Sequence, residues 1–172
     1  GLSATAYYDA QKTAFASGTN LCEVEVDIVT GHVTVTRYVV AHDCGRLINP
    51  MLVDGQIRGG VIHGIGNALF ERVHFDSAGQ PLTTNYGEYL LPLATDAPRI
   101  EIVHLETPSP LNPIGAKGAG EGGTIPSAAC VISGIEDALA PFGVVLTGHP
   151  VSPEDVRNVI DSAKPGDRRN VL

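Results

Sequence analysis

The sequence predicts an α+β domain in which a sheet containing an antiparallel hairpin packs with helices. Residues 21–27 and 32–38 each alternate apolar and polar side chains, and 28–31 supply a turn, which is typical of a β-hairpin with one buried face. Helical and strand-like segments are interspersed along the rest of the chain, and the antiparallel hairpin favours α+β over α/β. At 172 residues, one domain over 1–172 is expected, with a polar, fraying tail at 165–172.

The first half of the chain contains two predicted helices around the hairpin. Residues 2–16 have the spacing of a short amphipathic helix. The second hairpin strand continues through Ala41 and leads into a loop at 42–50. Residues 54–71 form the next predicted helix, because apolar side chains recur there at i, i+4 spacing, at Ile57, Val61, Ile65 and Leu69.

Glycine is unusually frequent inside the 54–71 segment. Each glycine in a helix interior costs about 1 kcal/mol relative to alanine. Such a composition indicates a close neighbour, either another helix or a ligand, and the glycines concerned are Gly59, Gly60, Gly64 and Gly66. Gln56 lies near the start of this helix. Its amide can donate and accept hydrogen bonds toward a heterocycle, or it can be a solvated first-turn residue.

The second half of the chain alternates between extended and helical patterns. A turn is predicted at 77–80, an extended segment at 86–92, a strand at 99–106 and a proline-rich extended segment at 107–113. A helix follows over 125–140, with Thr124 as N-cap and Pro141 as terminator. Residues 144–147 read as a short strand. The final predicted helix, 152–161, has Ser152 as N-cap and Pro153 at its first position.

Composition excludes several functional classes. A net charge of −8 and a pI near 5.1 argue against a nucleic-acid or anionic-membrane partner. We expect no membrane span and no signal peptide, because the sequence shows neither pattern. Three scattered cysteines predict reduced thiols in a cytoplasmic protein, and no metal-ligand spacing occurs among Cys and His. The only methionine is Met51 and the chain begins at Gly1, which indicates a piece of a longer protein.

A glycine-rich loop at 115–123 is the most distinctive stretch. It contains five glycines, one cation, Lys117, and one carboxylate, Glu121. An amide-rich loop that leads into a helix is a ready site for anionic or polar groups. It can equally be a surface turn whose glutamate complements the helix dipole. Residues 118–123 also satisfy G-x-G-x-x-G, but no buried strand precedes them and no P-loop G-K-[ST] occurs, so both nucleotide-binding interpretations are weak.

The chain resembles the C-terminal part of the molybdenum-binding subunit of the molybdenum hydroxylases. This family includes xanthine dehydrogenase, aldehyde oxidoreductase and the large subunit of aerobic carbon monoxide dehydrogenase. The resemblance covers nearly the whole chain but only about the last quarter of such a subunit. The blocks that carry it, in family order, are 42–50 (HDCGRLINP), 55–60 (GQIRGG), 89–92 (YLLP), 107–113 (TPSPLNP), 117–121 (KGAGE) and 135–139 (IEDAL).

The resemblance implies a molybdopterin-binding domain of the aldehyde oxidase/xanthine dehydrogenase type. Glu121 matches the glutamate that serves as general base beside the molybdenum, and Gln56 matches a glutamine that lies against the molybdopterin. The backbone of Lys117, Gly118, Ala119 and Gly120 matches the loop that wraps the cofactor. The pterin dithiolene holds the metal, so no side chain of this chain is expected to ligate it. Gly122-Gly123 departs from the bulkier, proline-containing pair of well-studied members.

The same resemblance implies cofactors and partners beyond this chain. The cofactor is expected to be molybdenum-molybdopterin, in its cytosine dinucleotide form in bacterial members. The remainder of the molybdenum-binding subunit, an iron–sulfur subunit with two [2Fe–2S] clusters and an FAD subunit are the expected partners. The implied activity is oxidative hydroxylation of an aldehyde, N-heterocycle or similar substrate. Two alternatives stay open: a non-catalytic assembly fragment of such a complex, and a small anion-binding module that uses the 115–123 loop.

Overall fold

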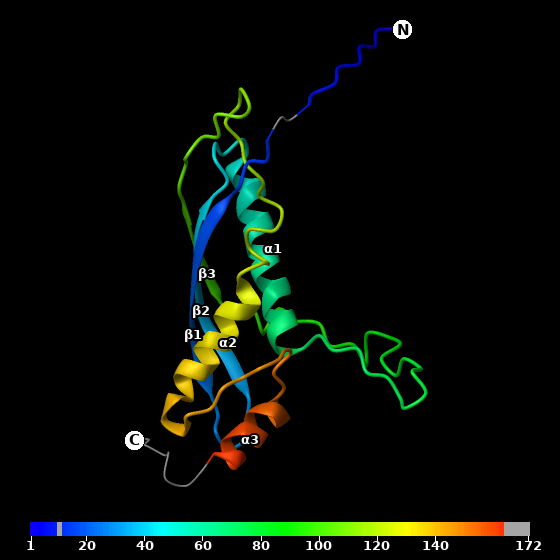
Figure 1. Ribbon diagram of the computed structural model, residues 1–172, viewed down its shortest axis with the longest axis vertical. Helices are drawn as coiled ribbons and strands as arrows, with labels where there is room; N and C mark the ends of the chain where they lie inside the picture. Colours follow the sequence, from blue (N-terminus) through cyan, green and yellow to red (C-terminus); the bar gives the residue numbers. More distant parts are fainter. Residues whose placement is uncertain (10–11, 164–172) are drawn as a thin grey trace.

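A three-stranded mixed sheet forms one layer of the protein. The computed structural model describes residues 1–9 and 12–163. Strands β1 (Ser17–Val26) and β2 (Val33–Asp43) pair antiparallel, which confirms the predicted hairpin, and a register shift occurs between Glu23 and Val24. Strand β3 (Arg99–His104) pairs with β2 in parallel, so the strand order is β1-β2-β3 (Figure 1).

Helices form the second layer against one face of this sheet. Helix α1 (Pro50–Leu69) and helix α2 (Ser127–Ala138) both lie on that face, and a 3₁₀ turn, η1 (Ala140–Phe142), follows α2 (Figure 1). Helix α3 (Pro153–Ser162) lies at the end of the molecule opposite the N-terminal segment. This arrangement confirms the α+β class.

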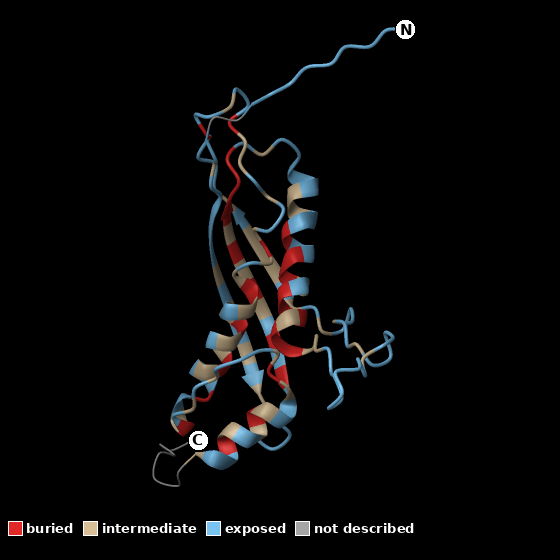
Figure 2. Cartoon of the chain, turned by 45° about the vertical axis from the view of Figure 1, so that its right-hand side comes forward, coloured by how far each residue is buried: buried red, intermediate tan, exposed pale blue. Residues whose placement is uncertain are grey.

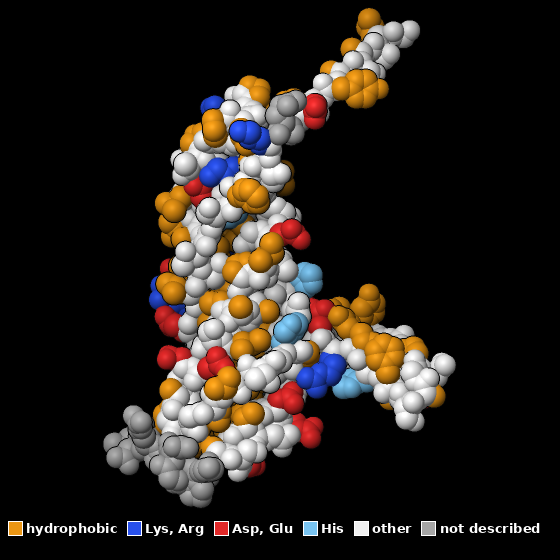
Figure 3. Space-filling view, in the orientation of Figure 1, with side chains coloured by type: hydrophobic (Ala, Val, Ile, Leu, Met, Phe, Trp, Pro, Cys, Tyr) orange, Lys and Arg blue, Asp and Glu red, His pale blue; other side chains and the backbone are white. Residues whose placement is uncertain are grey.

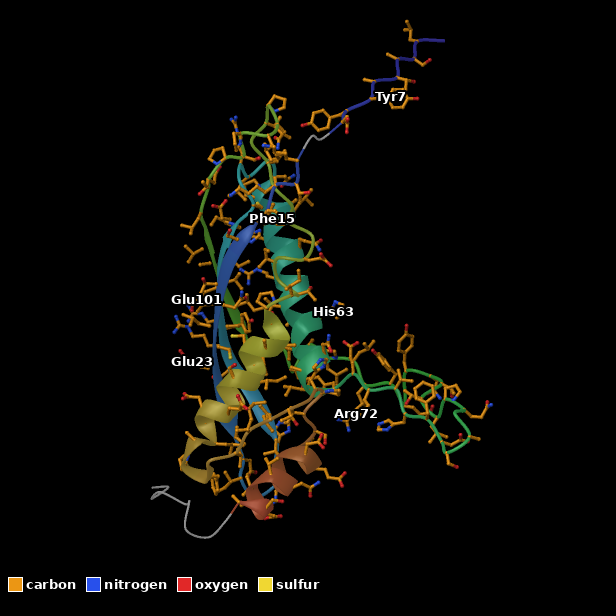
Figure 4. All side chains as sticks on the ribbon, viewed as in Figure 1. Tyr7, Phe15, Glu23, His63, Arg72 and Glu101 are labelled. Atoms are coloured by element: carbon orange, nitrogen blue, oxygen red, sulfur yellow. The ribbon has the colours of Figure 1, made fainter. Side chains whose placement is uncertain are left out.

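The core lies between the two layers (Figure 2). Alternate residues of β2 point toward the helices and are buried, and the i, i+4 stripe of α1 meets them. Fully buried members include Tyr38, Val40, Ile57, Val61, Ile65, Val131 and Ile135. On the other face of the sheet, Arg37 joins Glu23 of β1 and Glu101 of β3 at 2.9 Å each. Glu23 and Glu101 are labelled in Figure 4.

Two helix N-termini follow local capping chemistry. Helix α1 begins four residues earlier than predicted because the Asn49 side chain accepts a hydrogen bond from the Leu52 N–H at 3.2 Å and Pro50 occupies the first turn. Helix α3 has the predicted Ser152 cap, completed by a reciprocal bond with Asp155. Helix α2 differs: it begins at Ser127, with Pro126 at the N-cap position and no side-chain cap, so the Thr124 assignment was wrong.

Three further local predictions were wrong. The described part of 2–16 is not helical, because its apolar side chains, such as Leu2 and Tyr7, are exposed and find no surface to cover. Within the described residues, 144–147 pair with no strand; instead the Leu146 N–H donates to the Glu136 carboxylate at 2.7 Å. Residues 85–89 form a turn rather than an extended segment. The predicted tail at 165–172 lies outside the described residues.

A long excursion joins α1 to β3 and projects from the body of the molecule (Figures 1 and 3). We call residues 70–98 the arm. At its base, Arg72 donates to the Pro150 carbonyl at 2.6 Å and to the Asp155 carboxylate at 3.2 Å. The arm also presents exposed apolar side chains, which include Phe75, Leu82, Tyr86, Leu90, Leu91 and Leu93. No helix within the described ranges is both long and apolar enough to cross a membrane.

Candidate active site

The glycine loop is pressed directly onto helix α1. A Cβ placed on Gly60 would lie 2.9 Å from the Thr124 nitrogen and 3.0 Å from the Gly123 carbonyl carbon. A Cβ placed on Gly123 would lie only 2.3 Å from the Ile57 carbonyl oxygen. Such separations are possible only between backbones without side chains. The loop that bears Glu121 is therefore positioned by backbone packed against backbone.

The glycines of α1 have different neighbours, which confirms the sequence inference only in part. Gly64 meets helix α2, since a Cβ there would lie 2.3 Å from that of Ser127. Gly66 lies against Pro92 of the arm. Gly59 faces open space and is exposed, so no close neighbour in this chain explains it.

Gln56 reaches the loop that the sequence assigned to the same cofactor. Its side-chain nitrogen donates to the Gly120 carbonyl oxygen at 2.7 Å. The Gln56 amide oxygen accepts no hydrogen bond from the part of the chain that the structure describes, so it stays open to a ligand. The structure thus brings together two sequence-predicted site residues that are 64 positions apart.

Lys117 anchors the start of the loop. Its backbone N–H donates to the Cys44 carbonyl at 2.7 Å, and its ammonium lies 3.3 Å from the Asp43 carboxylate, with both side chains nearly buried. The same carboxylate oxygen accepts from the backbone N–H groups of Thr107 and Gly45. A hydrogen bond from the Thr107 side chain, followed by those from the two backbone N–H groups and from Lys117, holds the pKa of Asp43 well below its usual range. The backbone N–H and the ammonium of Lys117 thus serve the fold.

The rest of the loop presents unused donors. The consecutive backbone N–H groups of residues 118–122 donate to no acceptor among residues 1–9 and 12–163. Gly118 and Gly120 have no atom within 4 Å of a Cβ placed on them, so another molecule can approach their backbone. Because Gly118, Gly120 and Glu121 are exposed, these backbone donors are accessible to water or to an anionic group.

A pocket of about 400 Å³ lies beside these donors. Glu121 lines it, and the Glu121 carboxylate is exposed and forms no ion pair or hydrogen bond within the described ranges. The other lining residues come from the segment that leads into β1, the start of β1, the end of β2, the glycine loop and the turn before α2: Ala14, Phe15, Ala16, Ser17, Gly18, His42, Gly118, Gly122, Ile125 and Pro126. Phe15 is labelled in Figure 4, just before β1.

His42 is a pocket residue that the sequence analysis did not single out. It is 1% exposed, and burial, followed by the charge of the neighbouring His104, lowers its pKa. Its ring fills the space beside Gly122: a Cβ there would lie 2.6 Å from the His42 Cε1 atom. The sequence carried only a signal of burial, because His42 continues the inward-facing alternation of Tyr38 and Val40. His42 also explains why glycine follows Glu121 here.

These features fit an anionic cofactor with an acid–base partner. The unpaired amides suit a phosphate-bearing group, Gln56 offers an acceptor beside them, and Glu121 offers a free carboxylate at the same pocket. Among the residues that the structure describes, no cluster of three or more His, Cys, Asp or Glu side chains could hold a metal ion. The fold and the site together define a cofactor-binding domain.

Comparison with known proteins identifies the family. Residues 1–98 match the sequence profile of the molybdopterin cofactor-binding domain. The nicotine 6-hydroxylase large subunit of Paenarthrobacter nicotinovorans is 43% identical over 97% of this chain and 21% of that protein. Quinoline 2-oxidoreductase from Pseudomonas putida 86 superposes with a TM-score of 0.80 at 45% identity, covering 82% of this chain and 18% of that one. CO dehydrogenase from Oligotropha carboxidovorans gives 0.88 at 30%, covering 92% and 20%.

The chain therefore belongs to the molybdopterin cofactor-binding domain family of the molybdenum hydroxylases, as the sequence motifs indicated. It spans about one fifth of the length of the curated relatives that it matches.

Proposed function

We propose that this chain forms one wall of the molybdopterin site of a molybdenum hydroxylase and supplies its general base, Glu121. The observation that supports this most directly is a juxtaposition. The unpaired amides of residues 118–122 and the free Glu121 carboxylate belong to one loop, and Gly118, Glu121 and Gly122 line one pocket. A carboxylate with no partner among the described residues is available to a substrate-side proton.

Each residue has a distinct part in this proposal. The amides of Gly118, Ala119 and Gly120 bind the anionic part of the cofactor, and Lys117 fixes the loop from which they project. Gln56 holds the Gly120 carbonyl and turns its free amide oxygen to the pterin. The molybdenum centre, when bound, supplies the two-electron oxidation. Glu121 takes the proton that hydroxylation releases at the oxygen nucleophile.

We further propose the substrate class and the assembly. An N-heteroaromatic substrate is favoured over an aldehyde, because the names of nicotine 6-hydroxylase and quinoline 2-oxidoreductase both specify N-heteroaromatic compounds, at 43% and 45% identity. The remainder of the subunit completes the pocket, and iron–sulfur and FAD subunits carry the electrons away. The cofactor is proposed to be the cytosine dinucleotide form. The three free cysteines support a cytoplasmic location.

The test replaces the carboxylate and keeps its shape. In the complete protein, Glu121→Gln should retain molybdenum and pterin but lose about 10²–10⁴-fold of the rate of the reductive half-reaction, or roughly 3–5.5 kcal/mol of barrier. A carboxylate that only complements a helix dipole would cost about 0.3–1 kcal/mol of stability and leave the rate intact. Glu25→Gln, the same change at an exposed position of β1, is the matched control.

Metal and pterin analysis of the native protein separates the remaining interpretations. Suppose the molybdenum-to-protein ratio is near one and the rate of Glu121→Gln lies within about threefold of the parent rate. The loop then binds the cofactor, but Glu121 is not the general base. A native protein without pterin would instead indicate an assembly fragment or an anion-binding module.

A further inference from the structure

The buried His42 side chain has one ring nitrogen without a partner. Its Nε2 atom is inaccessible to solvent and makes no hydrogen bond to any described residue. An unsatisfied buried polar atom costs about 1–3 kcal/mol, so such an atom in a native protein calls for a partner, commonly a bound water. The mechanism proposed above does not use this atom.

A second histidine beside it also has a buried ring nitrogen without a hydrogen-bond partner. His104 of β3 is the register partner of His42 on the parallel strand, and adjacent strands lie only about 4.8 Å apart. The Nδ1 atom of His104 is also buried and unpartnered. Its other nitrogen, Nε2, lies 2.6 Å from a carboxylate oxygen of Asp54 in the first turns of α1. Two orphan nitrogens therefore occur on neighbouring side chains.

The carboxylate fixes the orientation of the whole array. Toward the Asp54 carboxylate the His104 Nε2 atom is the donor, and in the neutral imidazole its Nδ1 atom is then an acceptor. One water between the rings can donate to that Nδ1 and accept from a protonated Nε2 of His42. This leaves Nδ1 of His42 as a free acceptor. That atom lies on the ring edge facing Gly122, since a Cβ on Gly122 would lie 3.0 Å from it.

The surroundings disfavour a charged His42 ring and leave the array open to solvent at one end. Burial and the neighbouring His104 lower the pKa of His42, while Asp43 opposes them. Asp43 itself is paired with Lys117. The Asp54 side chain is 42% exposed, so it connects the array to solvent on the α1 side. At its other end the array borders the pocket that both His42 and Glu121 line.

We propose that Asp54, His104, one bound water and His42 form a proton path between the Glu121 pocket and solvent. This inference rests on the proposed function, because it begins with the proton that Glu121 receives. His42 is then a proton-transfer group on the pocket side, and Asp54 and His104 orient it. The path becomes necessary once the remainder of the subunit covers the pocket.

The transfer conserves protons at each step. The Glu121 carboxyl releases its proton through the pocket to Nδ1 of His42, which passes its Nε2 proton to the water. The water passes a proton to Nδ1 of His104, which gives its Nε2 proton to Asp54. Asp54 releases that proton to solvent, and reorientation of the water and exchange of the ring protons restore the starting tautomers. One proton enters and one leaves, and no electrons move.

The first test is structural and independent of activity. A crystal structure of the complete protein, at a resolution that places water molecules, should show one water within hydrogen-bond distance of both His42 Nε2 and His104 Nδ1. A dry contact between the two rings, or a protein side chain from elsewhere in the subunit bonded to either nitrogen, would overturn the proposal.

The second test separates the first turnover from later ones. In the complete enzyme, His42→Gln should keep its cofactor and a near-normal first turnover, because Glu121 starts deprotonated. Steady-state turnover should fall on the order of 10²-fold and recover when free imidazole is added. Asp54→Asn, at the far end and partly exposed, should behave the same way and serves if His42→Gln fails to fold. His63→Gln is the control, because His63 is exposed and lies on α1, the helix that also carries Asp54 (Figure 4).

Three outcomes of this test would contradict the path. These are steady-state rates of both variants within about threefold of the parent, loss of the first turnover in both, and absence of imidazole rescue. Failure of the underlying proposal looks different, because Glu121→Gln would then retain its first turnover whatever the other variants do.

Discussion

Replacing Gly60 by alanine should destabilise the protein relative to the same replacement at Gly59, because only Gly60 has another backbone packed against it. The structure provides a matched pair on one helix: a Cβ on Gly60 meets the backbone of Thr124 at 2.9 Å, whereas a Cβ on Gly59 meets nothing within 4 Å. Both Gly→Ala changes gain about 1 kcal/mol of helix propensity. That gain cancels when the two variants are compared. The difference between them is therefore the overpacking cost at Gly60, about 1–3 kcal/mol.

Thermal unfolding of the two variants measures this difference. For a chain of this size, each kcal/mol corresponds to about 2–4 °C, so the midpoint of Gly60→Ala should lie roughly 2–12 °C below that of Gly59→Ala. Gly60→Val, which must displace the loop before α2, should in addition abolish cofactor retention in the complete protein. Equal stabilisation by both alanine variants would refute the argument that the loop and α1 touch through their backbones.

Two further predictions concern the isolated chain and its response to acid. This chain alone should neither retain the full cofactor nor turn over, because it provides one wall of the pocket; a molybdenum-to-protein ratio near one with dye-linked oxidation of an N-heterocycle would contradict this. Asp43 should stabilise the fold above its unfolded pKa of about 3.9. Since its pKa is lowered in the folded state, that contribution is lost as the pH falls through the folded value. Urea unfolding at pH 7 should show Asp43→Asn destabilised by about 3–5 kcal/mol, because Lys117 is left nearly buried without a partner, and weaker acid sensitivity than the parent.

Local patterns predicted those elements whose stability is local or whose partner is adjacent in sequence. The hairpin of β1 and β2 and the Ser152 cap of α3 are of this kind. The parallel pairing of β3 with β2 was not predictable, since it joins segments separated by the whole of α1 and the arm. The helix predicted over 2–16 was wrong because a helical spacing of apolar residues gives no stable helix when no surface is available for them to pack on.

For the candidate site, motifs in the sequence predicted several of the residues but not the contacts between them. Gln56 and the 117–121 loop could be named from motifs, but their direct hydrogen bond could not, because it depends on how α1 and the loop are packed. The role of Lys117 as an anchor depends on Asp43, which lies 74 positions away. His42 was hidden because a histidine at an inward strand position looks like ordinary core. Only the structure shows that its nitrogen is unpaired and that its ring borders the pocket.

The contact of the glycine loop with α1 bears on how such a site can diverge. Gly60 and Gly123 approach each other through main-chain atoms, so this contact, unlike those made by Gln56 and Lys117, does not depend on side-chain identity. The pocket positions at 14–17 and Ile125 lie outside that contact, and Ile125 is exposed. Mutations there can reshape the pocket for a new ring system while the base keeps its coordinates. The reaction and the choice of substrate thereby depend on separate sets of residues. A library that randomises only the pocket positions 14–17 and Ile125 should yield altered specificity without loss of the reaction.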